Sequence, residues 1–276
     1  MSEQIFLNDQ PNYFDAGPGN DTVFARAGND TILGGDGDDV LGLGDGADLG
    51  YGGAGADQIF AASGNDAVSG DAGNDTIYAG FGDDRVFGGD GDDLIFGGTD
   101  DPNVPGADTI GGGNGNDTIY AGAGNDLVDG GSGDDVVGLG AGDDTVIVDG
   151  ADTIFGGDGN DVLLLTAAAA DYRVSSTSDG GMQIEHIASG KKSVVYGVEE
   201  LRATDGPLLE TADILALNLG SGGVSLELLG TSLLGGNGPG GSGGLPGLPD
   251  LGLPGLGLPG LGLPGLGLPD LGLGFL

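Results

Sequence analysis

Apolar residues in the first 165 positions recur every nine residues, which is neither the period of two of a long strand nor the 3.6 of a helix. From Val23 onward, a Val, Ile or Leu stands at nearly every ninth position, and mostly Gly, Asp and Asn fill the interval. Each nonamer therefore predicts a strand of about three residues followed by a turn of about six. A strand that short cannot bury an apolar side chain alone, so the copies must stack.

Sixteen copies align on one Asp, which recurs every nine residues apart from one insertion and one eight-residue step. The residue two before this Asp is Gly in all sixteen copies, and the residue four before it is Gly in eleven. Asn or Asp directly precedes it in twelve copies and Ala in four, and the residue two after it is Val, Ile or Leu in fifteen, with Gly50 as the exception. The sixteen residues are Asp21, Asp30, Asp39, Asp48, Asp57, Asp66, Asp75, Asp84, Asp93, Asp108, Asp117, Asp126, Asp135, Asp144, Asp152 and Asp161.

Two nonamers make one 18-residue coil, with strands on two faces and the Val, Ile and Leu side chains as a thin core between them. Stacking at about 4.8 Å places each Asp above the Asp 18 residues away, and carboxylates that close repel one another unless cations lie between them. Ca²⁺ suits such a site because it takes about six to eight oxygen ligands in tolerant geometry. The alternative is that Asp and Asn serve only as turn formers.

Charge and composition agree with a cation-binding chain. The 276 residues include 66 Gly, 44 acidic and six basic residues, for a formal net charge of −38, which leaves too few Lys and Arg to bind nucleic acid. The acids recur at fixed spacing between apolar residues, unlike the blocks of a disordered acidic tail. There is no Cys, so no disulfide can hold the fold together. Bound metal ions are then the expected source of stability for a Gly-rich chain that loses much backbone entropy on folding.

The nonamers resemble the RTX, or hemolysin-type, calcium-binding repeat GGxGxDxUx. Segments such as GGDGDDVLG (34–42) and GGDGDDLIF (88–96) match it throughout, and the resemblance covers roughly residues 17–164. It implies an all-β, right-handed parallel β-roll in which repeat Asp side chains and backbone carbonyls of adjacent coils bind Ca²⁺. The resemblance makes all sixteen aligned Asp residues the expected metal ligands. Because a site needs two stacked turns, we expect about a dozen ions.

The repeat is irregular at several points. The insertion from Gly97 to Gly106 is expected to bulge from one turn and to interrupt a calcium column. We expect calcium occupancy to be least secure there and at the eight-residue step to Asp152. The outer Gly, four before the repeat Asp, is replaced in five copies, by Arg26, Ala62, Asp71, Val104 and Val148.

The expected organisation is a lead-in (1–14), the roll (15–165), a small β cap (166–215) and a low-complexity tail (216–276). The cap resembles the segment that often follows RTX arrays, with Asp171-Tyr172 and Gly197-Val198-Glu199-Glu200-Leu201-Arg202. Its alternating MQIEHIA and KKSVVYGV segments predict strands that cover the end of the solenoid. Four of the six basic residues lie in the cap, either as ordinary solvated charge or to meet the acidic open end of another copy.

From Leu248 the tail carries a five-residue period, with Pro at 249, 254, 259, 264 and 269. The unit LGLPG resembles the elastin-type pentapeptide, in which Pro-Gly favours a type II turn. Two interpretations stay open. The tail is either a linker or part of a secretion signal, or it is an assembly element that docks on a neighbouring subunit.

The sequence offers little catalytic chemistry. His186 is the only histidine, there is no HExxH motif, and no GK[ST] follows a Gly-rich stretch. Repeats that begin by residue 17 leave no room for an N-terminal catalytic domain, so we do not expect an enzyme. We also expect no classical signal peptide, since residues 1–12 have neither a basic region nor a long apolar stretch, and no membrane insertion, since no run of 18 apolar residues exists.

The leading hypothesis is a secreted structural protein of the bacterial cell surface. It leaves the cell unfolded through the type I secretion machinery, which the RTX resemblance implies, folds in extracellular calcium, and forms a homopolymer as a filament, surface layer or matrix. An outward aromatic ladder three residues after the repeat Asp supports a contact surface. It comprises Phe24, Phe60, Tyr78, Phe96, Tyr120 and Phe155, interrupted by Gly42 and Gly138. The alternatives are a calcium-dependent adhesin or ligand-binding module at the cell surface and an accessory module of a separately encoded enzyme.

Overall fold

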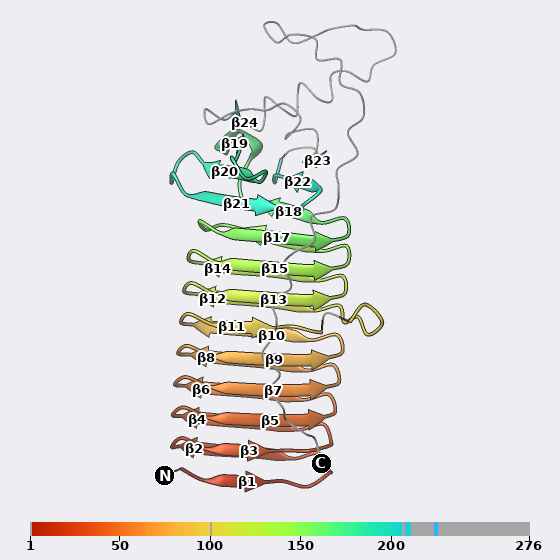
Figure 1. Cartoon of the computed structure of the whole chain (residues 1–276). Helices are drawn as coiled ribbons and strands as arrows, with labels where there is room; N and C mark the ends of the chain where they lie inside the picture. Colours follow the sequence, from red (N-terminus) through yellow and green to blue (C-terminus); the bar gives the residue numbers. More distant parts are fainter. Residues whose placement is uncertain (1, 100, 206–207, 211–223, 226–276) are drawn as a thin grey trace, which may run out of the picture. The chain divides into compact units, whose positions relative to one another are not determined.

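The computed structural model describes residues 2–99, 101–205, 208–210 and 224–225, all of them in the first of two units, 1–235. These residues form 24 β-strands and one short 3-10 helix, which confirms the all-β fold class. Stacked parallel strands wind through two sheets in a β-roll (Figure 1). Apart from residues 224–225, the expected tail lies outside the described residues.

The odd-numbered strands of the roll form one face, called sheet 1: β1 (Gln4–Phe6), β3 (Thr22–Phe24), β5 (Val40–Asp45), β7 (Gln58–Ser63), β9 (Thr76–Phe81), β11 (Leu94–Phe96), β13 (Thr118–Ala123), β15 (Val136–Ala141) and β17 (Thr153–Asp158). The even-numbered strands form sheet 2: β2 (Tyr13–Pro18), β4 (Thr31–Asp36), β6 (Leu49–Ala54), β8 (Ala67–Ala72), β10 (Arg85–Asp90), β12 (Thr109–Asn114), β14 (Leu127–Ser132), β16 (Thr145–Val148) and β18 (Val162–Leu165). The eighteen strands make nine coils. Most strands have six residues instead of the expected three, because each continues into the following turn.

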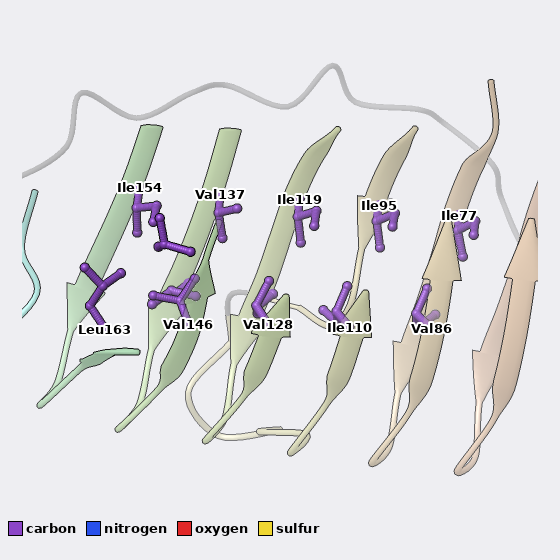
Figure 2. Close-up of a cluster of buried hydrophobic side chains, with 14 of the residues drawn as sticks. Ile77, Val86, Ile95, Ile110, Ile119, Val128, Val137, Val146, Ile154 and Leu163 are labelled. Carbon is purple, nitrogen blue, oxygen red and sulfur yellow. The ribbon is translucent and has the colours of Figure 1, made fainter. Parts of the chain in front are cut away.

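The register between coils follows the repeat. Each strand pairs in parallel with the strand two further along the chain, so that Ile59 pairs with Ile77 and Ile77 with Ile95. All fifteen Val, Ile and Leu residues two after the repeat Asp are buried. Figure 2 shows two files of these side chains, one from each sheet, meeting in the interior, for example at Ile119 and Val128. The predicted ladder core is therefore confirmed.

The one gap in this ladder is filled from a neighbouring position. A Cβ atom on Gly50 would lie 2.8 Å from a methyl carbon of Leu43, which is itself fully buried. The larger side chain of Leu43 thus takes up the space that Gly50 leaves. Close packing of this kind is what a thin core requires, because each coil contributes few side chains.

The segment expected as a lead-in already belongs to the first coil. Its strand β1 pairs in parallel with β3, and β2 begins at Tyr13 and pairs with β4. The insertion leaves the roll as a loop between β11 and β12 (Figure 1), and the strands on either side of it keep the regular parallel pairing. It therefore lengthens one turn without disturbing the stack.

The end of the roll is continued by strands of mixed direction. After the 3-10 helix η1 (Ala169–Asp171) come β19 (Tyr172–Ser176), β20 (Met182–His186), β21 (Lys192–Tyr196), β22 (Glu200–Arg202), β23 (Leu208–Glu210) and β24 (Val224–Ser225). Strand β21 pairs in parallel with β17, and β22 pairs in parallel with β18, so each sheet gains one further rung. Antiparallel pairing follows on both sides, through β20, β19 and β24 in sheet 1 and through β23 in sheet 2. In the described part of the chain, no helix is both long and apolar enough to cross a bilayer.

Candidate metal sites

The sixteen repeat Asp residues fall into two columns, one along each edge of the roll. The first column lies in the turns that lead from sheet 2 to sheet 1, and the second in the turns that lead from sheet 1 to sheet 2. The first column comprises Asp21, Asp39, Asp57, Asp75, Asp93, Asp117, Asp135 and Asp152. The second comprises Asp30, Asp48, Asp66, Asp84, Asp108, Asp126, Asp144 and Asp161.

Every one of these side chains is buried, with at most 4 % of its surface exposed. Within each column, the backbone N–H of one Asp donates to Oδ1 of the Asp one coil further on. The distance is 2.7 Å from Asp39 to Asp57 and 2.8 Å from Asp66 to Asp84. A continuous ladder of side chain to backbone hydrogen bonds thus fixes one oxygen of each carboxylate.

The second carboxylate oxygen has no partner in fifteen of the sixteen residues. Oδ2 of each is buried without a hydrogen bond, whereas Oδ2 of Asp152 accepts one from the Gly150 backbone N–H at 3.2 Å. A buried carboxylate oxygen without a partner is costly, so fifteen of them in two columns require a positive ligand that the protein itself does not provide.

In the first column, glycine lets the backbone approach these oxygens closely. Gly52 stands five residues before Asp57, and a Cβ atom on Gly52 would lie 2.5 Å from Asp57 Oδ2 and 2.7 Å from the carbonyl oxygen of Gly70 in the next coil. A carboxylate oxygen and a backbone carbonyl oxygen thus both lie close to the Gly52 backbone, where no side chain fits. Hard oxygen donors of these two kinds are the ligands that Ca²⁺ prefers.

Carbonyl groups are needed to complete a coordination shell. Among the described residues, no three acidic, His or Cys side chains gather closely enough to hold a metal ion by themselves. A cation between two coils would therefore combine carboxylates with the carbonyls of the Gly-rich turns. This donor set fits Ca²⁺ and does not fit metals that prefer nitrogen or sulfur ligands.

Burial raises the pKa of fourteen of these carboxyl groups, those of the repeats from Asp39 to Asp161. Desolvation is the main cause, and it raises the pKa of Asp66 and Asp126 to about 7 and that of Asp57 and Asp84 to about 6. Nearby carboxylates raise the pKa further, whereas the hydrogen bond from the preceding Asp N–H lowers it. Protons or cations must therefore neutralise the columns, and near neutral pH the cations have less competition from protons.

Both expected irregularities leave the ladder continuous. Across the insertion, the Asp84 N–H donates to Asp108 Oδ1 at 2.8 Å, and across the eight-residue step the Asp135 N–H donates to Asp152 Oδ1 at 3.1 Å. The insertion therefore does not interrupt the carboxylate ladder, because the extra residues leave through the loop, while an effect on calcium occupancy there stays a prediction. At the eight-residue step only Asp152 itself differs from the other repeat Asp residues, because its Oδ2 accepts a hydrogen bond from the Gly150 backbone N–H.

The turn backbone explains the glycine pattern. Gly55, two before Asp57, has φ +139°, and a Cβ there would lie 2.0 Å from the carbonyl oxygen of Gly37 one coil earlier. The outer position also takes positive φ, and it does so in three copies that lack Gly. These are Arg26 with φ 81°, Ala62 with φ 78° and Asp71 with φ 72°.

The residue before the repeat Asp forms a second ladder on the outside of the turns. The Ala56 N–H donates to Asp38 Oδ1 at 3.0 Å, and the Asp134 N–H donates to Asn116 Oδ1 at 3.0 Å. These bonds run toward the preceding coil, opposite in direction to the buried ladder. Sequence reasoning noted Asn and Asp at this position but did not identify this role.

Two residues at the ends of the columns were also missed. The Asp161 N–H donates to Glu199 Oε2 at 2.9 Å, and the Asp152 N–H donates to Ser193 Oγ at 3.2 Å. Both acceptors lie in the cap, outside the nine-residue period. Their positions follow only from the pairing of β22 with β18 and of β21 with β17.

The protein-family model for the RTX calcium-binding nonapeptide repeat matches the chain in six overlapping or adjacent segments. They are residues 8–41, 15–49, 43–77, 69–102, 111–146 and 140–165, which together span more than half of the 276 residues. No match to a curated protein was found. The family match coincides with the stacked coils and the buried carboxylate columns, so the chain belongs to the RTX calcium-binding nonapeptide repeat family, and its roll binds Ca²⁺.

Proposed function

We propose that this protein is a secreted structural protein whose roll folds around Ca²⁺ and then assembles with further copies outside the cell. The observation that carries the proposal is the pair of columns with fifteen buried carboxylate oxygens that lack a partner. The sixteen repeat Asp residues are the proposed ligands, together with carbonyl oxygens of the turns. Sites shared between neighbouring coils correspond to about a dozen ions.

Folding without cations is unfavourable for a physical reason. Buried carboxylates within one column repel one another, and the ion pair between Lys192 and Glu185 at 3.9 Å lies in the cap, away from the columns. With six basic residues against 44 acidic ones, the chain cannot neutralise itself. Self-repulsion then keeps it expanded where calcium is scarce, and this suits export in an unfolded state through a type I secretion route.

The assembly part of the proposal rests on the outer face of sheet 1. An aromatic stripe runs along it, with ring centroids 5.1 Å apart between Phe60 and Tyr78 and 4.8 Å apart between Tyr78 and Phe96. The rings are partly exposed, and Phe24 and Tyr120 each expose 37 %. The stripe consists of Phe6, Phe24, Phe60, Tyr78, Phe96, Tyr120, Phe155 and Tyr196, with gaps at Gly42 and Gly138. Exposed apolar rows of this kind suit association of rolls side by side.

The test is calcium addition to the purified full-length chain. We expect β-structure by circular dichroism to appear with Ca²⁺ and ordered polymers to follow in electron microscopy. The double variant Phe60→Ser/Tyr78→Ser is expected to fold and stay monomeric, whereas Phe87→Ser, on the exposed face of sheet 2, is expected to polymerise normally. A wild-type chain that folds with calcium and stays monomeric at high concentration would refute the assembly proposal.

The aromatic stripe also favours a second function, a calcium-dependent adhesin. The rings are stacked in nearly parallel planes, with 1° between those of Tyr78 and Phe96, and their outward edges form a regular apolar row that an apolar or sugar-like ligand could contact. In that case the folded wild type stays monomeric and adheres to cells or glycans. The Phe60→Ser/Tyr78→Ser variant then loses adhesion while Phe87→Ser retains it.

A further inference from the structure

The cap contains a partial copy of the repeat, as the strand register between the cap and the roll shows. Strand β22 pairs with β18 so that Glu200 stands opposite Val162 and Leu201 opposite Leu163. Glu199 therefore stands opposite Asp161, in the place that a repeat Asp would take in the next coil. The buried Leu201, two residues later, matches the core position.

Glu199 also makes the contact of a repeat Asp. The Asp161 N–H donates to Glu199 Oε2 at 2.9 Å, as the Asp144 N–H donates to Asp161 Oδ1 at 3.0 Å one coil earlier. The longer Glu side chain thus reproduces the rung of the ladder. The ladder of the second column ends at this residue.

The close approach of a turn glycine to the free carboxylate oxygen, seen at Gly52 in the first column, is found here as well. A Cβ atom on Gly156 would lie 2.5 Å from Asp161 Oδ2 and 1.9 Å from the carbonyl oxygen of Gly197 in the cap. Asp161 is fully buried and its Oδ2 has no partner. A free carboxylate oxygen, a carbonyl oxygen and the Glu199 carboxylate thus come together where the roll meets the cap.

The first column ends differently. The pairing of β21 with β17 places Ser193 opposite Asp152, and the Asp152 N–H donates to Ser193 Oγ at 3.2 Å. The hydroxyl of Ser193 donates in turn to the Gly150 carbonyl oxygen at 3.3 Å, and Asp152 Oδ2 is occupied by the Gly150 N–H. Both carboxylate oxygens of Asp152 and the Ser193 hydroxyl thus have neutral hydrogen-bond partners.

We propose that Glu199 is a calcium ligand, so that an ion held by Asp161 and Glu199 ties the cap to the second column, whereas the first column ends at Ser193 without an ion. The inference rests on calcium binding by the roll and extends the set of ligands beyond the repeats. Removal of this one ion would loosen β22 and leave the coils intact.

The test compares Glu199→Gln with Glu200→Gln in the full-length chain. The Glu199→Gln side chain keeps an oxygen that accepts the Asp161 N–H but loses the charge, whereas Glu200 occupies the strand position of Val162 and is the matched control. Native mass spectrometry at saturating Ca²⁺ counts the ions per chain. Hydrogen exchange measures protection of the β22 amides and, in the same sample, of the coils.

We expect Glu199→Gln to bind one ion fewer than the wild type and to lose calcium-dependent protection in β22, while protection from β3 to β15 stays unchanged. Glu200→Gln is expected to match the wild type in both readouts. An unchanged ion count and unchanged β22 protection in Glu199→Gln, with a calcium-loaded roll, would overturn this inference alone. A wild-type chain that binds no Ca²⁺ would overturn both the inference and the proposed calcium-dependent folding.

Discussion

The two edges of the roll carry the same carboxylate ladder but are lined by different residues. Five residues before the repeat Asp, most copies of the first column have Gly, as at Gly52 and Gly88. Most copies of the second column have a buried Ala or Leu there, as at Leu43 and Ala79. One edge therefore keeps backbone and carboxylate in close contact, whereas the other adds apolar side chains to the core.

The difference shows that one repeat position serves two purposes. At the first edge, Gly is required by space, because any Cβ would meet a carboxylate oxygen. At the second edge, the side chain is required by packing, and Leu43 even takes up the space that Gly50 leaves. The pattern reverses near the cap. Gly156 stands five before Asp161 of the second column, and in the first column the buried Val148 takes the equivalent strand position, although the eight-residue step leaves it only four before Asp152.

Removal of calcium is expected to have the largest effect, because it leaves the buried carboxylates of both columns without cations. In excess chelator at pH 7.5 we expect loss of the β circular dichroism signal of the roll. Without calcium, stability is expected to rise as the pH falls, since the folded-state pKa values of about 6 to 7 at residues such as Asp57 and Asp66 lie above the unfolded value. This contribution is full below about pH 4 and is lost as the pH rises through about 6 to 7.

Urea titrations in chelator between pH 4 and 8 measure this dependence. Saturating Ca²⁺ is expected to reverse its sign, because protons then compete with the ion for the same carboxylates. A calcium-free roll that gains stability between pH 5 and 7.5 would contradict the assignment of a raised pKa to the columns.

The next largest effect is expected from substitutions five residues before the repeat Asp, one at each edge of the roll. Gly88→Ala would bring a Cβ within 2.2 Å of Asp93 Oδ2 and 2.5 Å of the Gly112 carbonyl oxygen, so we expect a loss of about 2–3 kcal/mol. Ala79→Gly, at the same repeat position of the second column, removes one buried methyl group and is expected to cost only about 1 kcal/mol. Urea unfolding in saturating calcium measures both, and equal losses would show that the two edges are equivalent.

A charge at the neutral end of the first column would make the two ends more alike. Ser193→Asp places a carboxylate opposite Asp152, so we expect one additional bound ion at saturating calcium. An unchanged ion count would mean that a carboxylate at this end does not suffice to form a site.

The smallest effects are expected from relief of backbone strain. Ala62 and Asp71 adopt positive φ at the outer turn position of the second and first edge, respectively. Replacement of either by Gly removes a penalty of about 1–2 kcal/mol and costs about 0.5–1 kcal/mol in chain entropy, so each variant is expected to gain about 0.5–1 kcal/mol. Similar shifts of the urea midpoint for the two variants would confirm that the strain is the same whether Gly or an apolar residue lines the edge. A loss of stability in either variant would contradict the assigned strain.

The periodic part of the molecule was predictable because its physics is local and repeats. A Val, Ile or Leu two residues after each Asp has to face inward once the coils stack, and all fifteen do so. The position of Gly55 requires Gly, because the turns of neighbouring coils lie so close together that a Cβ there would collide with the backbone. The two Asp columns follow from the same period, since a shift of 18 residues brings equivalent positions together.

The ends and interruptions of the repeat were not predictable from spacing. Glu199 lies 38 residues after Asp161 and Ser193 lies 41 after Asp152, so no period connects them. Spacing did predict that the insertion bulges from one turn, but it could not show that the carboxylate ladder continues from Asp84 to Asp108 across it.

The sequence by itself thus determined the coil, its core and the two columns, because each rests on interactions between equivalent positions of identical units. Only the tertiary structure decided how the columns end, since β21 and β22 reach the roll through long-range pairing. It also decided the difference between the two edges, because the burial of Leu43 and the narrow space at Gly52 depend on which sheet each turn leaves.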